Sequence, residues 1–438
     1  MGLLGAGEQA QWITALMTVM AGGASHIRSA VKARVGFAAR RTRIWQSPPY
    51  RLADGYIRGL DGLRALAAIA VICFHLGTPG LALGWAGVKF FFVLSGFLIT
   101  RILLDAKGNR NFYSNFYRRR ALRIFPIYYL TLISVLLIGG FRLGRDVSDW
   151  PWYALYLQGW RPVFADRMPF FQHTWSLAIE EQFYLLWPFV VASLSRRTLT
   201  GACVILICLA PISRLFGILV GDWVGVWVVG LRTLDALAWG ALIATLPHAR
   251  ATLLRIGMVG LAATVLFAIQ GGYVTWQSSR ETISGCVILP SLLAIAFAGV
   301  LLLTMHSARL ASLFELAPLR YLGRISYGLY LYHYSIFFVV NMAISRLAPN
   351  LPIVGGAILK IAVTLIVSAV SFAFFERHMI ALGRRELSPG GGQIGRCATW
   401  LAWGPARTLD QTAQRGIAMD FMLTQHKLQR RICCPGSR

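Results

Sequence analysis

Charged residues are scarce in this chain, and acidic residues are the scarcest. Charged side chains make up 14% of the 438 residues, whereas a soluble domain usually carries about 25%. Hydrophobic residues reach 56%, and many apolar runs attain the roughly 20 residues that cross a bilayer. These proportions exclude a soluble globular protein and predict a polytopic integral membrane protein.

The shortage of Asp and Glu leaves a formal net charge of +26, because 43 Lys and Arg face only 17 acidic residues. The basic residues lie at the ends of apolar runs and in the two terminal segments, as the preference for Lys and Arg in cytoplasmic loops produces. We therefore expect no nucleic-acid partner. Membrane lipids with anionic head groups and a polyanionic ligand such as coenzyme A remain plausible partners.

Several other signals are absent. The seven cysteines form no disulfide framework, and no convincing cluster of metal ligands occurs, so we expect no metal site. The N-terminal run WITALMTVMA is too short to span a membrane, and it lacks the charged start and cleavage site of a signal peptide. We expect three segments: a basic N-terminal tail with an amphipathic stretch at 1–57, a membrane domain at 58–378, and a basic, disordered C-terminal tail at 379–438.

The apolar runs predict an all-α membrane domain of about ten transmembrane helices. The expected spans are 62–77, 85–104, 124–142, 176–194, 200–220, 228–246, 255–271, 283–305, 325–344 and 353–375. The 105–123 loop is rich in Arg, whereas the 78–84 and 221–227 loops contain no Lys or Arg. Both termini are therefore predicted to be cytoplasmic, which in a bacterium places the protein in the inner membrane.

The first expected span carries an arginine and a histidine, Arg64 and His75, at its two ends. Eleven helical steps bring them to nearly the same face, about 16 Å apart along the axis. Arg64 could be a snorkelling anchor that pairs with Asp61. Neutral His75 can accept a proton near pH 7, as a general base must, although a structural histidine would also fit.

Other ionisable residues also lie inside expected spans, where a charge is costly and needs a partner or a function. In HTWSLAIEEQFYLLWP, Glu180, Phe183 and Tyr184 lie within about one helical turn of one another. Arg232 and Asp235, at i and i+3, could form an internal ion pair, and mutual neutralisation is as plausible as chemistry.

Three further stretches admit two interpretations. Ser95 and Gly96 in FFFVLSGFLIT favour close helix packing. Arg120 and Arg123 in FYRRRALRIFP could obey the charge rule or clamp phosphates. In RYLGRISYGLYLYHYSIF the tyrosines are typical of an interfacial aromatic belt, and His333 is a second candidate base without an evident orienting partner.

Together these stretches resemble the integral-membrane acyltransferase type three family, which includes O-acetylases of bacterial surface polysaccharides and lipopolysaccharide. The resemblance runs from about Gly59 to Arg377 and rests on RGLDGLRALAAIAVICFH, GVKFFFVLSGFLIT, FYRRRALRIFPIYYL, HTWSLAIEEQFYLLWP, LDALAWGALIA and LGRISYGLYLYH, in that order. It implies transfer of an acyl group, acetyl by default, from cytoplasmic acyl-CoA to a hydroxyl of an extracytoplasmic glycan, lipopolysaccharide or exopolysaccharide unit. Acyl-CoA is then a co-substrate, and no bound cofactor is expected.

The resemblance also implies roles for residues. Its arginine–histidine motif maps onto Arg64 and His75, its paired-arginine motif onto Arg120 and Arg123, and its ExxFY motif onto Glu180, Phe183 and Tyr184. His75 would act as the general base, Arg64 would stabilise the oxyanion or bind a CoA phosphate, and Glu180 would orient His75 or an arginine. Ser95, Phe183, Tyr184, Arg232 and Asp235 are expected to help bind substrate, with Arg120 and Arg123 on the CoA phosphates.

The sequence departs from the family pattern in two places, and one alternative function also fits its residues. Arg232 stands three residues before Asp235, where relatives often place it two before. No esterase-like domain follows the last span, so the acyl group is expected to pass directly to the acceptor or to a separate protein. Since His75 lies beyond Arg64 on one helix, we expect a cavity open to both sides. The rival is a proton-coupled transporter or flippase that uses His75, Glu180 and Asp235 as a relay.

Overall fold

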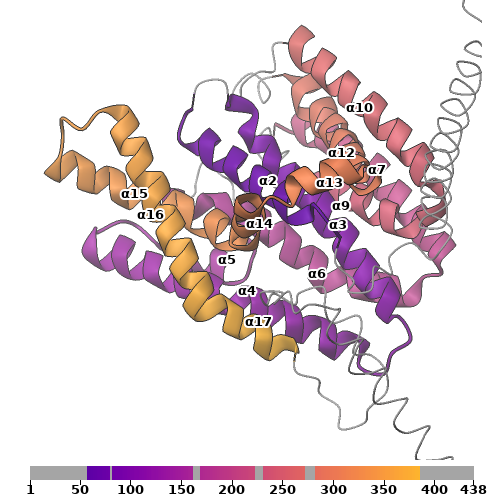
Figure 1. The fold of residues 1–438 in the computed structure, drawn as a ribbon, viewed down its shortest axis with the longest axis horizontal. Coiled ribbons are helices and arrows are strands. Elements are labelled where there is room, and N and C mark those ends of the chain that lie inside the picture. Colours follow the sequence, from indigo (N-terminus) through magenta and orange to yellow (C-terminus); the bar gives the residue numbers. More distant parts are fainter. Residues whose placement is uncertain (1–56, 79–80, 161–167, 222–229, 272–281, 385–438) are drawn as a thin grey trace, which may run out of the picture.

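The computed structural model describes residues 57–78, 81–160, 168–221, 230–271 and 282–384, and every element in these ranges is helical (Figure 1). The longer elements are α2 (Leu60–His75), α3 (Gly87–Ala106), α4 (Phe112–Leu136), α6 (Trp175–Ser193), α7 (Arg196–Leu219), α9 (Gly230–Thr245), α10 (Arg250–Gln270), α12 (Ile283–His306), α15 (Ser326–Leu347) and α16 (Ile353–Ser371). The shorter ones are η1 (Ala82–Ala86), η2 (Leu137–Arg142), α5 (Trp150–Ala154), η3 (Gln158–Trp160), η5 (Pro169–Thr174), η6 (Pro247–Ala249), α13 (Ala308–Phe314), α14 (Ala317–Arg324), η7 (Phe372–Glu376) and α17 (Arg377–Arg384). The prediction of an all-α membrane fold is confirmed.

Within the described residues, seven helices are long and apolar enough to cross a membrane. They are Leu83–Ala106, Phe112–Arg142, Arg196–Leu219, Pro247–Gln270, Ile283–His306, Ser326–Leu347 and Ile353–Gly383. The other three expected spans correspond to α2 and α9, which are 16 residues long, and to α6, which carries two glutamates. The count of ten and the side of the termini therefore stay predictions.

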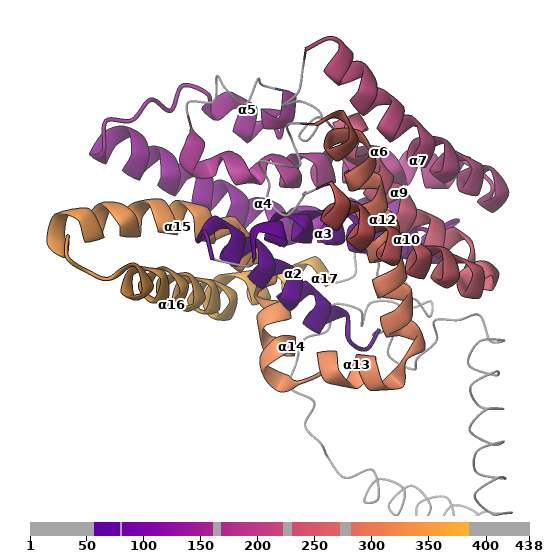
Figure 2. The same cartoon turned by 90° about the horizontal axis from the view of Figure 1, so that it is seen from above.

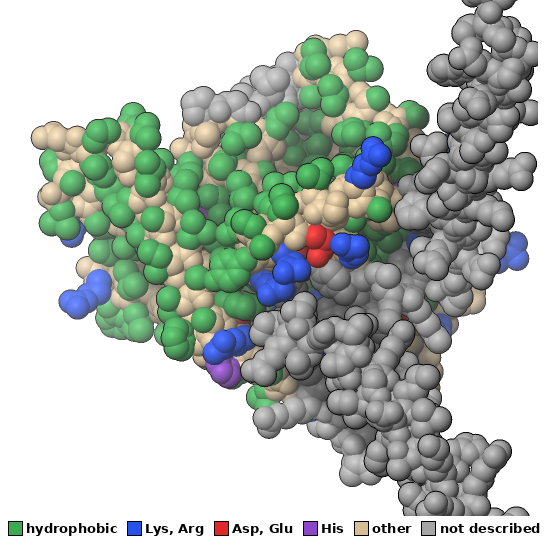
Figure 3. Space-filling model, in the orientation of Figure 1, with side chains coloured by type: hydrophobic (Ala, Val, Ile, Leu, Met, Phe, Trp, Pro, Cys, Tyr) green, Lys and Arg blue, Asp and Glu red, His purple; other side chains and the backbone are tan. Residues whose placement is uncertain are grey.

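The surface has the character expected of a lipid-facing protein. Hydrophobic side chains cover most of the face in Figure 3, while many of its Lys and Arg side chains gather over α13, α14 and α17. Such a separation of apolar and basic surface is typical of a helical bundle with one basic membrane interface.

The helices form two groups around a central pair. In Figures 1 and 2, α15 and α16 lie at one end and α7, α9, α10 and α12 at the other, with α2 and α3 between them. Glycine allows α3 and α9 to approach closely: a Cβ atom on Gly96 would lie 1.9 Å from the Leu237 carbonyl oxygen, and one on Gly240 would lie 1.9 Å from that of Val93. The packing role predicted for Gly96 is confirmed.

The beginning of α2 is held by the segment between α12 and α15. Gly59 has φ of 84°, a left-handed conformation that favours glycine, and its amide donates to Glu315 Oε1 at 2.7 Å. Gly323 of α14 lies against the backbone of Asp61, because a Cβ atom on Gly323 would lie 1.9 Å from the Asp61 carbonyl oxygen. These contacts fix the first turn of α2 beside α15 and thereby position Arg64.

The C-terminal helix extends the folded domain. α17 continues to Arg384, beyond the domain boundary predicted at residue 378. The Arg118 guanidinium of α4 donates to the carbonyl oxygens of Leu382 and Gly383, at 3.1 and 3.3 Å, and ties the end of α17 to α4. Residues 1–56 and 385–438, on which most of the tail predictions fall, lie outside the described residues.

Candidate active site

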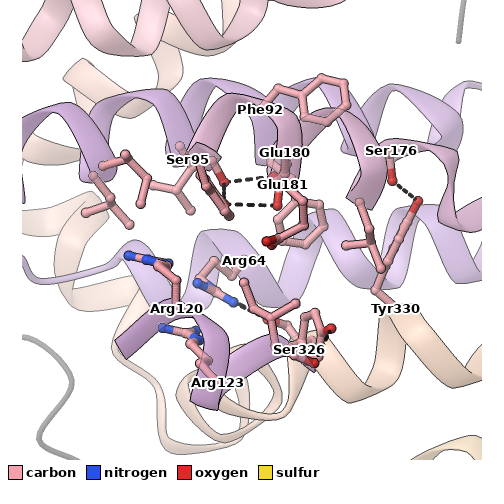
Figure 4. Close-up of a pocket in the computed structure, with 18 of the residues that line it drawn as sticks. Arg64, Phe92, Ser95, Arg120, Arg123, Ser176, Glu180, Glu181, Ser326 and Tyr330 are labelled. Atoms are coloured by element: carbon pink, nitrogen blue, oxygen red, sulfur yellow. Dashed lines mark hydrogen bonds between the residues drawn. The ribbon is translucent and has the colours of Figure 1, made fainter. Parts of the chain in front are cut away.

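A pocket opens between α2, α3, α4, α6 and α15, with an empty volume of about 1270 Å³ that includes its open part. It is lined by six of the predicted site residues, which come from four separate helices: Arg64, Ser95, Arg120, Arg123, Glu180 and Tyr184. In Figure 4, Arg120 and Arg123 lie at one end, Ser176 and Tyr330 at the other, and Arg64, Glu180 and Glu181 between them. The fold therefore joins motifs that are distant in sequence.

One wall of the pocket carries a closed hydrogen-bonded group of three side chains. Ser95 Oγ donates to Glu180 Oε1 at 2.8 Å, and Tyr184 OH donates to Glu180 Oε2 at 3.1 Å. The Tyr184 hydroxyl also lies 3.2 Å from Ser95 Oγ. Both Glu180 oxygens are thus engaged by α3 and α6, so Glu180 does not orient His75 through these bonds. The role expected of Glu180 toward His75 is not seen.

Glu181, the next residue, also lines the pocket, but it differs from Glu180 in its contacts. Its carboxylate makes no hydrogen bond or ion pair with the described part of the chain. Glu181 lies outside the ExxFY motif, which begins at Glu180, so its sequence position predicts no role for it. A carboxylate without a partner beside three arginines is available to a ligand.

Three arginines, Arg64, Arg120 and Arg123, also line the pocket, together with three acidic residues, Asp61, Glu180 and Glu181. Arg64 donates from Nε and Nη2 to Ser326 Oγ, at 3.2 and 3.1 Å. The Arg120 guanidinium lies 5.3 Å from the ring centre of Tyr184. Within the described ranges, neither Arg64, Arg120 nor Arg123 forms an ion pair. Guanidinium groups that face one pocket and form no ion pair can bind a multiply charged anion.

The far end of the pocket is closed by Ser176 and Tyr330. Their hydroxyl oxygens lie 2.6 Å apart, and the Tyr330 hydroxyl also donates to the His173 carbonyl oxygen at 2.9 Å. Tyr330 is only 7% exposed, so its assignment to an interfacial aromatic belt was wrong. Its ring lies 5.7 Å from the His333 ring and 5.6 Å from the His173 ring. Tyr330 therefore separates the pocket from a group of histidines.

His75 belongs to that histidine group and does not line the described pocket. It is half-buried at the end of α2, where Nδ1 lies 3.0 Å from the Val71 carbonyl oxygen and 3.1 Å from His333 Nε2. The ring of Tyr334 packs against it at 4.8 Å. The pocket thus includes Arg64 but not His75, contrary to the single cavity expected to join them.

Two of these histidines were undervalued in the sequence. His333 has the partners that the sequence did not show, because its Nδ1 lies 2.7 Å from the Tyr330 carbonyl oxygen and its Nε2 faces His75. His173, which opens the HTWSLAIEEQFYLLWP stretch, was not considered; its ring centre lies 4.9 Å from that of His333. Among the described residues, no group of His, Cys, Asp and Glu could hold a metal ion.

The predicted pair of Arg232 and Asp235 is replaced by another. Asp235 binds Arg214 of α7, with Nη2 and Oδ2 2.9 Å apart and both side chains fully buried. Ser291 of α12 donates to the same Asp235 oxygen at 2.9 Å, and Arg214 Nη1 donates to the Arg232 carbonyl oxygen at 2.6 Å. An i, i+3 spacing does not reveal a partner on a neighbouring helix. This group ties α7, α9 and α12 together and lies outside the pocket lining.

Phe183 also lies outside the lining of the pocket. It is 6% exposed, and its ring stacks on Trp187 with the ring centres 4.9 Å apart. The ExxFY motif is therefore divided: Glu180 and Tyr184 face the pocket, whereas Phe183 packs in the core. A substrate contact by Phe183 is not supported by its position.

Several known proteins of similar sequence are named O-acetyltransferases. The chain is 30% identical over 361 residues to the peptidoglycan O-acetyltransferase OatA of Listeria monocytogenes, an alignment that covers 74% of this chain and 56% of the relative. It is 30% identical over 356 residues to the O-acetyltransferase OatA of Staphylococcus aureus, covering 73% and 57%. The chain thus spans little more than half the length of these relatives. No solved structure matches significantly.

A family model described as an acyltransferase domain matches residues 57–373, which include every helix that lines the pocket as well as the histidine group. The match and the arrangement of the motifs agree with the resemblance seen in the sequence. The chain belongs to the integral-membrane acyltransferase type three family.

Proposed function

We propose that this protein transfers an acyl group, most simply acetyl, from acyl-CoA to a hydroxyl group of a glycan on the opposite side of the membrane. The observation that carries the proposal is the pocket in which three arginines without ion pairs face the Ser95–Glu180–Tyr184 group. The names of the relatives, which are peptidoglycan and other O-acetyltransferases, support acetyl as the group and a glycan as the acceptor.

The phosphates of coenzyme A fit the end of the pocket that carries Arg120 and Arg123. Arg120 and Arg123, at its one end, bind the diphosphate or the 3′-phosphate, because guanidinium groups pair with phosphate through two parallel hydrogen bonds. The thioester then points toward the end formed by Ser176 and Tyr330. Arg64, between the two ends, is placed to donate to the thioester oxygen as negative charge develops during attack.

His75 supplies the base for the acceptor. The hydroxyl oxygen of the glycan bonds to the acyl carbon while its proton passes to a His75 nitrogen, the carbon–sulfur bond breaks, and the CoA thiolate leaves and takes up a proton. Because Tyr330 separates the pocket from His75, the acyl end of the donor has to pass the contact between Ser176 and Tyr330 before transfer. In this proposal, the Tyr330 side chain moves away from Ser176 and so brings the acyl group and His75 into one site.

The proposal is tested with the full chain in liposomes. Labelled acetyl-CoA is supplied on one side and a panel of peptidoglycan, lipopolysaccharide and exopolysaccharide fragments on the other, and both CoA release and glycan labelling are measured. Release that depends on one glycan class and, at low acetyl-CoA concentration, is strongly reduced in Arg120→Gln/Arg123→Gln is the expected result. Acetyl-CoA that stays intact with every acceptor, while a glycan fragment crosses the bilayer, would instead support the transporter.

A further inference from the structure

The hydrogen-bond partners of the histidine group determine which ring nitrogen of each histidine carries the proton. Each ring nitrogen that faces a carbonyl oxygen must carry hydrogen, because a carbonyl oxygen can only accept. His333 Nδ1 lies 2.7 Å from the Tyr330 carbonyl oxygen, so the proton of neutral His333 is on Nδ1. Its Nε2 then carries a lone pair and acts as an acceptor.

The same reasoning fixes His75. Its Nδ1 faces two acceptors, the Val71 carbonyl oxygen at 3.0 Å and His333 Nε2 at 3.1 Å. His75 Nδ1 must therefore carry the proton and share it between them. The lone pair of His75 is left on Nε2, the ring nitrogen without a hydrogen bond to the described residues.

We propose that His333 is a positioning residue for His75: its Nε2 accepts the Nδ1 proton of His75, directs the basic Nε2 toward the acceptor, and stabilises the imidazolium formed during attack. The inference rests on the proposed function as far as His75 is the base, whereas the hydrogen bond itself does not.

The order of donors and acceptors, from His75 through His333 to the Tyr330 carbonyl oxygen, determines where the positive charge can lie during attack. When Nε2 takes the acceptor proton, His75 becomes cationic, and its Nδ1–H bond to neutral His333 becomes a charge-assisted hydrogen bond. The next partner along the chain is the Tyr330 carbonyl oxygen, which cannot take up a proton. The positive charge can therefore be shared between the His75 and His333 rings but passes no further along the hydrogen bonds, and His75 Nε2 keeps the acceptor proton until it passes to the leaving thiolate.

His173 provides the matched control. Its ring packs on His333 with the ring centres 4.9 Å apart, and it is buried to a similar degree. Its Nε2, however, faces the Leu331 carbonyl oxygen at 3.1 Å and makes no hydrogen bond to His75. Replacing His173 by Phe removes a buried imidazole from the same cluster without removing an acceptor from His75.

The first experiment is nuclear magnetic resonance on protein labelled with ¹⁵N in histidine, with signals assigned through His75→Ala and His333→Phe. We expect His75 to be protonated at Nδ1 and to show a ¹⁵N–¹⁵N coupling to His333 Nε2 across the hydrogen bond. A His75 ring protonated at Nε2 would overturn the inference. This measurement does not need turnover, so it separates a failure of the inference from a failure of the proposed function.

The second experiment compares kinetics of His333→Phe, His333→Gln and His173→Phe. We expect kcat to fall about 10- to 100-fold in His333→Phe, less than the loss of a whole general base, with KM for acetyl-CoA unchanged. His333→Gln keeps an acceptor oxygen and should recover most of the loss, and His173→Phe should keep kcat near wild type. Equal losses in His333→Phe and His333→Gln, or in His333→Phe and His173→Phe, would make the role merely structural.

Discussion

Two groups of buried charges lie against different faces of α3, and only one of them is paired. On the face toward α9, Arg214 and Asp235 form a fully buried ion pair, to which Ser291 adds a further hydrogen bond. On the face toward α2, α4 and α6, the pocket holds arginines that make no ion pair among the described residues. A satisfied charge group ties helices together, whereas an unsatisfied one in a pocket is available to a ligand.

The comparison shows that an ionisable residue in a membrane helix is a weak indicator of function by itself. Arg214 and Asp235 interrupt apolar runs and Arg64 stands at the end of one, so all three are anomalous in sequence. What separates them is the partner that the fold supplies. If pairing separates structural from functional charges, substitutions in the paired group should change stability, whereas substitutions in the pocket should change binding or turnover.

The largest effect is expected at His75, which lies beyond both charge groups. His75→Ala should lower kcat for glycan acetylation by about 10²–10⁴-fold, because the acceptor hydroxyl then lacks a base. Proteoliposomes with labelled acetyl-CoA give the rate, and thermal unfolding in detergent checks that the variant is folded. Undiminished transfer by folded His75→Ala would move the base elsewhere, with the uncommitted Glu181 of the pocket as the next candidate.

Breaking the Arg214–Asp235 ion pair should lower the stability of the protein. Asp235→Ala leaves Arg214 buried without its anion, and we expect the free energy of unfolding to fall by about 3–5 kcal/mol. Thermal or denaturant unfolding of the purified protein measures this, with activity taken per folded molecule. The double variant Arg214→Met/Asp235→Leu should recover most of the stability, since well-packed apolar side chains can replace a buried pair. A stable Asp235→Ala protein without activity would instead place Asp235 in the chemistry.

Much of this arrangement could be predicted from the sequence, because it depends on local pattern. Apolar runs gave the helical membrane fold, and the motif residues Arg64, Ser95, Arg120, Glu180 and Tyr184 do meet in one pocket. Gly96 could be assigned to packing because small residues are what close helix contacts require.

The rest depended on contacts between helices, which spacing within one helix cannot reveal. Asp235 binds Arg214 on α7 rather than Arg232 one turn away, and Phe183 turns into the core although its neighbours face the pocket. His333 seemed to lack an orienting partner, since His75 is 258 positions away along the chain. Tyr330 was assigned to the interface because its burial follows from packing against α6 and η5, not from its own sequence.

Substituting the pocket arginines Arg120 and Arg123 should weaken the binding of acetyl-CoA. Removing one charge-assisted contact to a phosphate in Arg120→Gln or Arg123→Gln should raise KM for acetyl-CoA about 10-fold, with kcat nearly unchanged. Initial rates at varied acetyl-CoA give both constants. The loss should shrink at high salt, because screening weakens wild-type binding as well.

Arg118→Gln is the matched control for these variants. It removes the same charge from the same helix, but Arg118 donates to the end of α17 and does not line the pocket. KM should therefore stay at the wild-type value. An equal rise in KM for Arg118→Gln would mean that general positive charge near the membrane, rather than the pocket, attracts the donor.

The smallest effect is expected at Tyr330, the residue that divides the pocket from the histidine group. Tyr330→Phe removes the hydroxyl that contacts Ser176 and donates to the His173 carbonyl oxygen, at a cost of about 1 kcal/mol in stability. If the acyl group must pass this contact, the variant should transfer at the wild-type rate or up to about 3-fold faster, because the hydrogen bond to Ser176, one part of that energy, no longer has to break during passage. A 100-fold fall in kcat would show that the hydroxyl takes part in the reaction. Tyr330 would then take part in acyl transfer between the donor pocket and His75, and would not act only as a side chain that separates them.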